Sequence, residues 1–370
     1  MSQALRVGVV GCGAISGAYF VGARTFPWIQ FVACADIDRT AALRKATEFG
    51  VPRVLSVDGL LADPEVDVVL NLTVPKAHAA VALAALQAGK HTYSEKPFGV
   101  GREEGRQVLE EAERRGLRVG CAPDTFLGSG AQTARKLIDD GAIGRPVAFT
   151  ALYMGRGHET WHPSPEFYYE PGGGPMFDMG PYYLTALFNL LGPARRITAA
   201  ATVALPQRTV TSQPKFGKTI SVQTPDHVCG TIEFQNGAAG VIIQSFATHH
   251  PQYDEKHPIM VYGTDGTLRV PDPNTFDGPV HLRRGDDPEW REVPPAFHRG
   301  YCRSVGLADM AKALGSGRPH RCSGELAYAV LDAMQGFLDS AASGRAHDAV
   351  APFDRPAPMP SHLPFGTLDD

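Results

Sequence analysis

The chain has 370 residues, of which 43% are hydrophobic and 20% are charged, and its formal net charge is −4 at pH 7. This composition is typical of a globular protein and excludes a disordered chain, and no apolar run approaches the ~20 residues that a membrane-spanning helix needs. The slightly acidic balance, without a block of Lys and Arg, disfavours nucleic acid as a partner. The length favours two domains.

The beginning of the sequence predicts a cytoplasmic protein. Residues 1–6 lack the basic start and the apolar stretch of a secretory signal, and a strand-like run already begins at Leu5. The six cysteines are scattered, with no Cys-x-x-Cys pair. This spacing favours isolated reduced thiols over a disulfide framework or a sulfur-ligated metal site.

The first third of the chain alternates short strands with Ala-rich helices. Runs rich in valine, isoleucine and leucine predict strands near residues 5–10, 31–35, 66–72, 91–97 and 118–121. Helices are expected between them, near residues 14–25, 40–49, 78–89 and 102–115. Strand and helix alternating at this spacing predict a doubly wound parallel sheet of the Rossmann type, which we assign to residues 1–124.

The pattern changes after residue 146. Strands become longer and their alternation wider, as in residues 228–246 around the Asn236-Gly237 turn. These features predict a second α/β domain with a largely antiparallel, open sheet, which we assign to residues 125–345. Residues 346–370 show no periodicity, and we expect an extended, Pro-rich tail.

The first strand runs into a glycine-rich turn, GVVGCGAIS. Gly11 permits the tight turn, and Gly13 lets the backbone approach a pyrophosphate, which would rest on the helix that begins around Ala14 and Ile15. A serine stands in place of the third glycine of the fingerprint. The next strand ends at Asp36, whose carboxylate can accept bonds from ribose hydroxyls and repel a 2′-phosphate, so the pattern predicts NAD rather than NADP.

Two later strands bring further residues to the same edge of the predicted sheet. The third strand is followed by Thr73 and Pro75, and the fourth by Glu95 and Lys96. Ligands of such sheets bind at the carboxyl ends of the strands. We therefore expect these four residues to face the cofactor.

Taken together, these landmarks resemble those of the Gfo/Idh/MocA oxidoreductase family. The resemblance covers residues 5–343 and rests on GVVGCGAIS with Asp36, TVPKAH, GKHTYSEKP, IDDGAIGRP, GGGPMFDMGPYYL and GTDGTL. It implies a nucleotide-binding domain followed by an α/β domain whose open sheet often mediates oligomer contacts, and hence a homo-oligomer, either a dimer or a tetramer. It also implies that His78 belongs to the cofactor site and that Lys96 is a catalytic residue beside the nicotinamide.

Some positions depart from the family pattern. Lys76 stands where an Asn is common, and Asp124, which we assign to the substrate site, lies near a place where members often carry Asn. Where many members have Asp-x-Gly-x-His, this chain has Asp178 and Tyr182 at the two ends of the motif. The change from His to Tyr resembles branches of the family in which Tyr takes the acid/base position.

The chemistry of these residues agrees with that assignment. Oxidation of a secondary alcohol needs a base for the hydroxyl proton, and a Tyr, with an ordinary pKa of about 10, needs help to serve near neutrality. Lys96 close to Tyr182 would favour the phenolate, while Asp178 would orient the Lys or the substrate. The spacing of Asp178 and Tyr182 suits one helix face, but Pro181 allows either a kink or a new helix start.

The stretch HETWH, residues 158–162, matches the H-E-x-x-H zinc pattern letter for letter. Glycines precede it and Pro163 follows it, which opposes the helix that the zinc pattern requires, so no bound metal is expected. The loop instead suits a polyol or sugar, with hydrogen-bonding side chains and an aromatic face. The expected substrate-binding residues of this loop are Arg156, His158, Trp161 and His162.

We therefore predict an NAD(P)-dependent oxidoreductase that transfers a hydride between a nicotinamide cofactor and a secondary alcohol or ketone of a sugar, sugar derivative or cyclitol. Lys96, Asp178 and Tyr182 are the expected catalytic residues. Two alternatives stay open. A non-catalytic nicotinamide-binding regulator would bind the cofactor without turnover, and a zinc hydrolase would hold zinc at the HETWH stretch.

Overall fold

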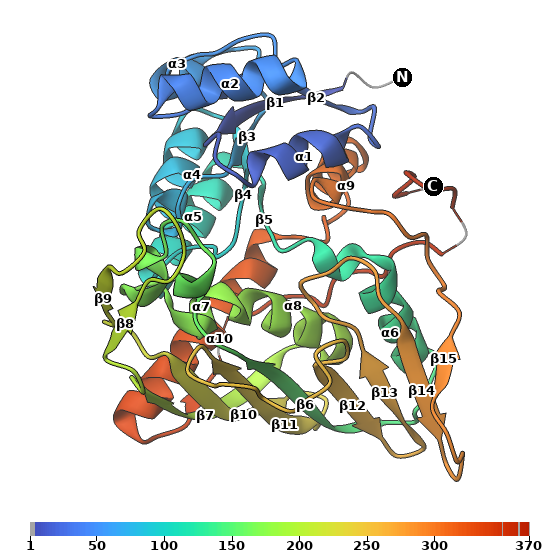
Figure 1. The fold of residues 1–370 in the computed structure, drawn as a ribbon. Helices are drawn as coiled ribbons and strands as arrows, with labels where there is room; N and C mark the ends of the chain where they lie inside the picture. Colours follow the sequence, from blue (N-terminus) through green and yellow to red (C-terminus); the bar gives the residue numbers. More distant parts are fainter. Residues whose placement is uncertain (1–3, 350, 362, 370) are drawn as a thin grey trace. The chain divides into compact units, whose positions relative to one another are not determined.

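The computed structural model describes residues 4–349, 351–361 and 363–369 (Figure 1). The chain forms two compact units. The first takes the described residues of Met1–Gly128, Phe297–Tyr328 and Pro356–Asp370, and the second takes those of Ser129–Ala296 and Ala329–Arg355. The contiguous boundaries expected from the sequence, at 124/125 and 345/346, stay predictions. Residues 1–3 of the expected first domain and residues 350, 362 and 370 of the expected tail lie outside the described residues.

Parallel strands form the sheet of the first unit, in the order β2-β1-β3-β4-β5. Their bounds are β1 (Leu5–Val10), β2 (Ile29–Ala35), β3 (Val68–Asn71), β4 (His91–Ser94) and β5 (Val119–Cys121). The predicted Rossmann-type sheet is confirmed. The winding reverses between β1 and β3, and the crevice at the carboxyl ends of these two strands is where ligands of doubly wound sheets bind.

The predicted helices of the first unit are also present. The unit contains α1 (Ser16–Ala23), α2 (Arg39–Phe49), α3 (Val57–Ala62), η1 (Pro75–Ala77), α4 (His78–Gln87), α5 (Arg102–Arg115), η2 (Thr125–Leu127) and α9 (Val305–Ser316). The short α3 was not predicted. It is started by Ser56, whose hydroxyl accepts a hydrogen bond from the backbone N–H of Gly59 at 3.0 Å.

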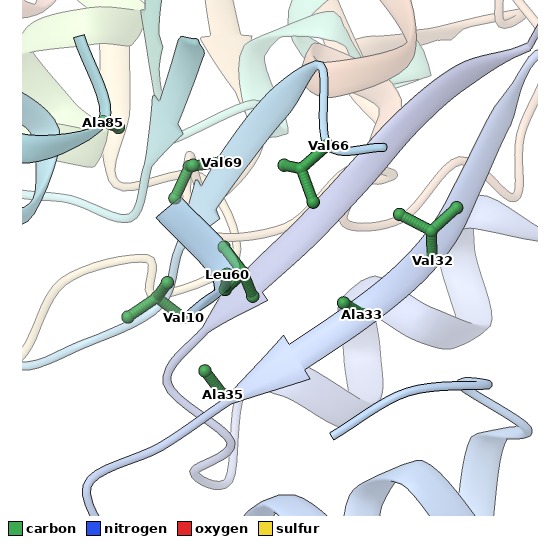
Figure 2. Packing of buried hydrophobic residues seen from close by; sticks show 8 residues of the cluster. All are labelled: Val10, Val32, Ala33, Ala35, Leu60, Val66, Val69 and Ala85. Carbon is green, nitrogen blue, oxygen red and sulfur yellow. The ribbon is translucent and has the colours of Figure 1, made fainter. Parts of the chain in front are cut away.

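Apolar side chains of α3 complete a core cluster beside the central strands, which Figure 2 shows. Leu60 and Val66 fill the space above Gly8, where an added Cβ would lie 2.8 Å from Leu60 Cδ2. The strands therefore read as nearly continuous apolar runs, as expected for a parallel sheet that is covered on both faces. The cluster consists of Val10, Val32, Ala33, Ala35, Leu60, Val66, Val69 and Ala85.

The second unit contains a nine-stranded sheet in the order β15-β14-β13-β12-β6-β11-β10-β7-β16. Strands β6 and β11 pair in parallel and the other neighbours pair antiparallel, so the prediction of a largely antiparallel sheet is confirmed. A separate hairpin is formed by β8 (Gln207–Thr209) and β9 (Thr219–Ser221). The sheet strands are β6 (Pro146–Met154), β7 (Ala194–Thr202), β10 (His227–Phe234), β11 (Ala239–Ser245), β12 (Ile259–Gly263), β13 (Gly266–Val270), β14 (Val280–Arg284), β15 (Arg291–Val293) and β16 (His347–Asp348).

Helices α6 and α8 lie over one face of this sheet (Figure 1). On β6, Phe149 and Ala151 are buried while Thr150 and Leu152 between them are partly exposed, so the two faces of the sheet differ in exposure. The helical segments of the unit are α6 (Ser129–Asp139), η3 (His158–Thr160), η4 (Glu166–Tyr169), α7 (Gly174–Asp178), α8 (Gly180–Leu191) and the part of α10 (Gly324–Ser343) from Ala329 onward. Within the described part of the chain, no helix is long and apolar enough to cross a membrane.

Candidate active site

The glycine-rich turn after β1 has the geometry that a dinucleotide needs. Gly11 has a φ of +99°, and a Cβ added there would lie 2.6 Å from the carbonyl carbon and oxygen of Leu72, so only glycine fits. A Cβ added at Gly13, by contrast, would meet no atom within 4 Å. The backbone at Gly13 therefore borders open space directly before α1. Since the first N–H groups of a helix lack intrahelical partners, this space suits a pyrophosphate.

Asp36 is held at the same turn. Its Oδ2 accepts a hydrogen bond from the backbone N–H of Cys12 at 2.7 Å, and its Oδ1 accepts one from the N–H of Asp38 at 2.8 Å. Two neighbouring apolar side chains, which the sequence reading missed, are open to solvent: Ile37 is 100% exposed and Val74 is 62% exposed. The turn thus combines a fixed carboxylate with nearby apolar surface within one unit.

A buried histidine connects the loops that follow β3 and β4. His78 Nδ1 lies 2.7 Å from the carbonyl oxygen of Pro97, and Nε2 lies 3.0 Å from that of Thr73. Burial lowers the pKa of His78, which favours the neutral ring with a single N–H, and the shorter contact with Pro97 is the better candidate for that donor. Thr73 is also held by Asn71, whose Oδ1 accepts from the Thr73 hydroxyl at 2.7 Å. His78 therefore holds the loop after β3 and the loop after β4 together.

Glu95 is likewise a buried anchor. Its Oε1 accepts a hydrogen bond from the Tyr19 hydroxyl at 2.8 Å, and its Oε2 accepts one from the backbone N–H of Lys96 at 3.0 Å. Burial raises the pKa of Tyr19, so this phenol stays protonated and donates. The carboxylate joins α1 to the loop that carries Lys96, a partly exposed residue. Pro75, at the start of η1, is partly exposed as well.

Asp124, which the sequence assigns to the substrate site, lies in the interior of the first unit. The carboxylate is fully buried, where it accepts a hydrogen bond from Arg303 Nη1 at 3.1 Å and one from the backbone N–H of Gly306 at 3.2 Å. Burial raises the pKa of Asp124 in spite of the Arg303 guanidinium. These partners come from a distant part of the sequence, so no local pattern announced them. They join Asp124 to the segment that contains Arg303 and Gly306.

In the second unit, the segment from Asp178 to Tyr183 joins two helices. Asp178 is the last residue of α7, and α8 begins at Gly180, so Pro181 marks a helix start rather than a kink. Tyr182 lies in the first turn of α8, where the partial positive charge of the helix N-terminus favours an anion. The adjacent Tyr183 is fully buried and donates its hydroxyl to the carbonyl oxygen of Leu152 at 3.1 Å. Tyr183 is therefore a packing residue.

The HETWH stretch does not form the α-helix of a zinc motif. Residues 158–160 form one short 3₁₀ turn, η3. His158 Nε2 lies 2.7 Å from Oδ2 of Asp178, and the Trp161 indole N–H donates to His158 Nδ1 at 3.1 Å. His162 Nδ1 accepts a hydrogen bond from the backbone N–H of Ser164 at 3.0 Å. Both ring nitrogens of His158 are thus already engaged.

Glu159 turns to a different, buried network that the sequence reading missed. Its Oε1 accepts a hydrogen bond from Arg208 Nη1 at 3.0 Å, and the Tyr169 hydroxyl donates to its Oε2. Arg208 Nη2 in turn donates to Asp226 at 2.9 Å and to the carbonyl oxygen of Phe246 at 2.7 Å. This network anchors η3 against the β8–β9 hairpin. Breaking one partner of such a buried ion pair is strongly destabilising.

The structure gathers the sequence-predicted residues into distinct groups. In the first unit, Gly11 and Gly13 lie in one turn, to which Asp36 is hydrogen-bonded, and Ala14 and Ile15 lead from this turn into α1. Around the β3 and β4 loops lie Thr73, Pro75, His78, Glu95 and Lys96. In the second unit, one network joins His158, Trp161 and Asp178. Arg156 is exposed, and Trp161 keeps 61% of its surface open to solvent.

Comparison with known proteins gives matches along most of the chain. Residues 5–122 match the model of an oxidoreductase family with an NAD-binding Rossmann fold, and residues 131–269 match that of the GFO/IDH/MocA C-terminal domain. The chain is 27% identical over 269 residues to 1,5-anhydro-D-fructose reductase of Ensifer adhaerens, which covers 71% of this chain and 74% of that protein. It is 26% identical over 315 residues to trans-1,2-dihydrobenzene-1,2-diol dehydrogenase of Bos taurus, which covers 84% and 87%.

A similar fold is found among solved structures. Levoglucosan dehydrogenase in complex with NADH and L-sorbose superposes with a TM-score of 0.81 at 23% identity, covering 94% of this chain and 100% of that one. At this identity the likeness concerns the fold.

Proposed function

The chain belongs to the Gfo/Idh/MocA family of NAD-binding oxidoreductases, and on this premise we propose that it acts on a secondary alcohol, or the matching ketone, of a sugar, sugar derivative or cyclitol. The substrate class is supported by relatives that are named as a 1,5-anhydro-D-fructose reductase and a levoglucosan dehydrogenase. The main support for the proposal is the hydrogen-bond network of Asp178, His158 and Trp161. A hydrogen-bonded carboxylate and the exposed face of Trp161 lie on one loop network, and this combination suits a polyol with an apolar ring face.

NAD, when bound, supplies the hydride acceptor or donor. We propose that its pyrophosphate lies at Gly13 and the start of α1, because a Cβ at Gly13 would have open space around it. Asp36 would accept hydrogen bonds from the ribose hydroxyls and repel a 2′-phosphate, which favours NAD over NADP. The exposed side chains of Ile37 and Val74 offer apolar surface for the adenine. His78 and Glu95 would act indirectly, by holding the loops that carry Thr73, Pro75 and Lys96.

For proton transfer we propose Tyr182 as the acid/base residue, with Lys96 and Asp178 as its partners. Tyr182 lies in the first turn of α8, and a helix N-terminus stabilises a phenolate. A cation near a phenol acts in the same direction, which is the role we give to Lys96. Asp178, fixed by His158, would accept a hydrogen bond from a substrate hydroxyl. The cooperation of Lys96 with Tyr182 rests on this chemistry and on the family pattern.

We further propose that the chain forms a homo-oligomer, a dimer or a tetramer, through the second sheet. The register places a row of partly exposed apolar side chains across neighbouring strands, formed by Leu152, Ile243 and Cys229. We take this row to be part of the surface through which two copies of the chain meet. All six cysteines are free thiols, which fits the cytoplasmic location that we propose.

A cofactor and substrate screen tests the function. The protein is incubated with NAD or NADP and a panel of sugars, sugar acids and cyclitols, and the absorbance of the reduced nicotinamide is followed; the matching ketones are tested with the reduced cofactors. We expect turnover on at least one polyol class, with NAD the better cofactor. Tight NAD binding without turnover on the whole panel would instead support a non-catalytic regulator.

A further inference from the structure

We propose that His158 and Trp161 are positioning residues that fix the orientation and charge of Asp178. The proposal rests on the proposed function, because it takes Asp178 to bind the substrate. It gives His158 a role that differs from direct substrate contact. The two hydrogen bonds of the His158 ring together determine where its proton lies.

The tautomer of His158 follows from its partners. An indole N–H can only donate, so the 3.1 Å contact from Trp161 Nε1 requires His158 Nδ1 to be an acceptor without a proton. In a neutral ring the proton must then be on Nε2, which lies 2.7 Å from Asp178 Oδ2 and donates to it. A donor directed at a carboxylate stabilises its ionised form. Trp161 thus sets the tautomer, and the tautomer holds Asp178 as an anion.

The surroundings of His158 hold the ring in place. The ring is buried and makes an edge contact with Tyr168, at 4.3 Å between centroids and 64°, and a tilted contact with Phe246, at 4.6 Å and 59°. The next residue, Glu159, is tied to Arg208 at 3.0 Å, so the backbone at this point is anchored as well. With both nitrogens engaged and the ring buried, His158 offers no group to a substrate. Its contribution reaches the substrate through Asp178.

Trp161 then has two separable roles. Its exposed aromatic face is available to a sugar ring, while its N–H is committed to His158. Trp161→Phe keeps an aromatic face and removes the N–H. His158→Gln keeps an amide N–H that can reach Asp178 from about the position of Nε2, whereas His158→Phe keeps the ring shape and removes every donor. The three variants therefore distinguish hydrogen bonding from packing.

The kinetic test compares these variants with Trp290→Phe, a control for a tryptophan that packs on Arg269 instead. We expect His158→Phe to lower kcat about 10- to 100-fold, the loss expected when a carboxylate loses its donor. NAD affinity should change much less, and His158→Gln should restore kcat to within a few-fold of the wild type. Trp161→Phe should lower kcat while Trp290→Phe should not. Equal losses in the Gln and Phe variants of His158 would overturn the proposal.

A spectroscopic test does not depend on turnover. Protein labelled with ¹⁵N in histidine is studied by long-range nitrogen–proton correlation, and the His158 signals are assigned by their absence in His158→Gln. We expect a protonated Nε2 and an unprotonated Nδ1, with this fixed tautomer lost in Trp161→Phe. A proton on Nδ1, or an unchanged spectrum in Trp161→Phe, would overturn the proposal that Trp161 fixes the tautomer of His158. A protein with the expected tautomer but no activity on any substrate would refute the proposed function, while the positioning of Asp178 by His158 and Trp161 would still hold.

Discussion

Two glycines of the same turn should respond in opposite ways to the same substitution. At Gly13 an added Cβ meets no atom within 4 Å, and the backbone has no positive φ, so Gly13→Ala should leave the folded state unstrained. Its stability should be unchanged or higher by up to about 1 kcal/mol, because alanine restricts the unfolded chain. At Gly11 the φ of +99° and the approach to the Leu72 carbonyl at 2.6 Å forbid a Cβ. The φ alone costs about 1–2 kcal/mol, and the overlap adds to it.

Gly13→Ala should weaken cofactor binding although it does not lower the stability of the fold. If the open space at Gly13 receives the pyrophosphate, Gly13→Ala should weaken NAD binding at least about tenfold, which corresponds to about 1.4 kcal/mol. Urea unfolding and titration calorimetry with NAD measure the two quantities on the same protein. Wild-type NAD affinity in a stable, folded Gly13→Ala protein would refute the assignment of this space to the cofactor.

Other expected outcomes follow from single contacts. Asp36→Ala should shift the ratio of NAD to NADP affinity toward NADP, and an unchanged ratio in direct binding would contradict the assigned role. Tyr19→Phe should lower the free energy of unfolding by about 1.5–3 kcal/mol, since it removes a donor from the buried Glu95 carboxylate; a denaturation curve like that of the wild type would count against this contact. Burial lowers the pKa of His78 and of His320 below 6.5, so the unfolded chain binds protons that the folded chain excludes below that pH. The unfolding free energy should therefore decrease as the pH is lowered from about 7 to about 5, and His320→Gln should make this decrease smaller. Chelator treatment should leave turnover unchanged, and one zinc per chain in a metal analysis would argue for the hydrolase alternative.

The first sheet and the glycine turn could be predicted from the sequence because their signals are local. Strand, turn and helix follow one another within residues 5–23, and helix 102–115 was predicted at its observed bounds. The short α3 has too few residues for a helical period to show. The grouping of Phe297–Tyr328 with the first unit rests on packing between residues far apart in the chain, which no local pattern reports.

The chemistry of individual side chains was harder to predict than their presence near the site. Asp124, for example, follows a strand end as a ligand-binding residue would, yet Arg303 is its partner from 179 positions away. The HETWH stretch matches a zinc motif in sequence, but in the structure His158 is paired with Asp178 and Glu159 with Arg208. Hydrogen-bond partners that are distant in sequence decide the role of a polar residue, and a linear motif contains no record of them.

The most direct test of the account compares two adjacent tyrosines. Tyr182→Phe should keep the fold and NAD binding while lowering turnover by roughly 10²–10⁴-fold, and the limb of the pH–rate profile that belongs to this phenol should disappear. Tyr183→Phe removes only a buried hydrogen bond to Leu152, so it should lower the unfolding free energy by about 1 kcal/mol and leave turnover near the wild-type value. Near-normal turnover and an unchanged pH limb in Tyr182→Phe would contradict the claim that Tyr182 transfers the proton.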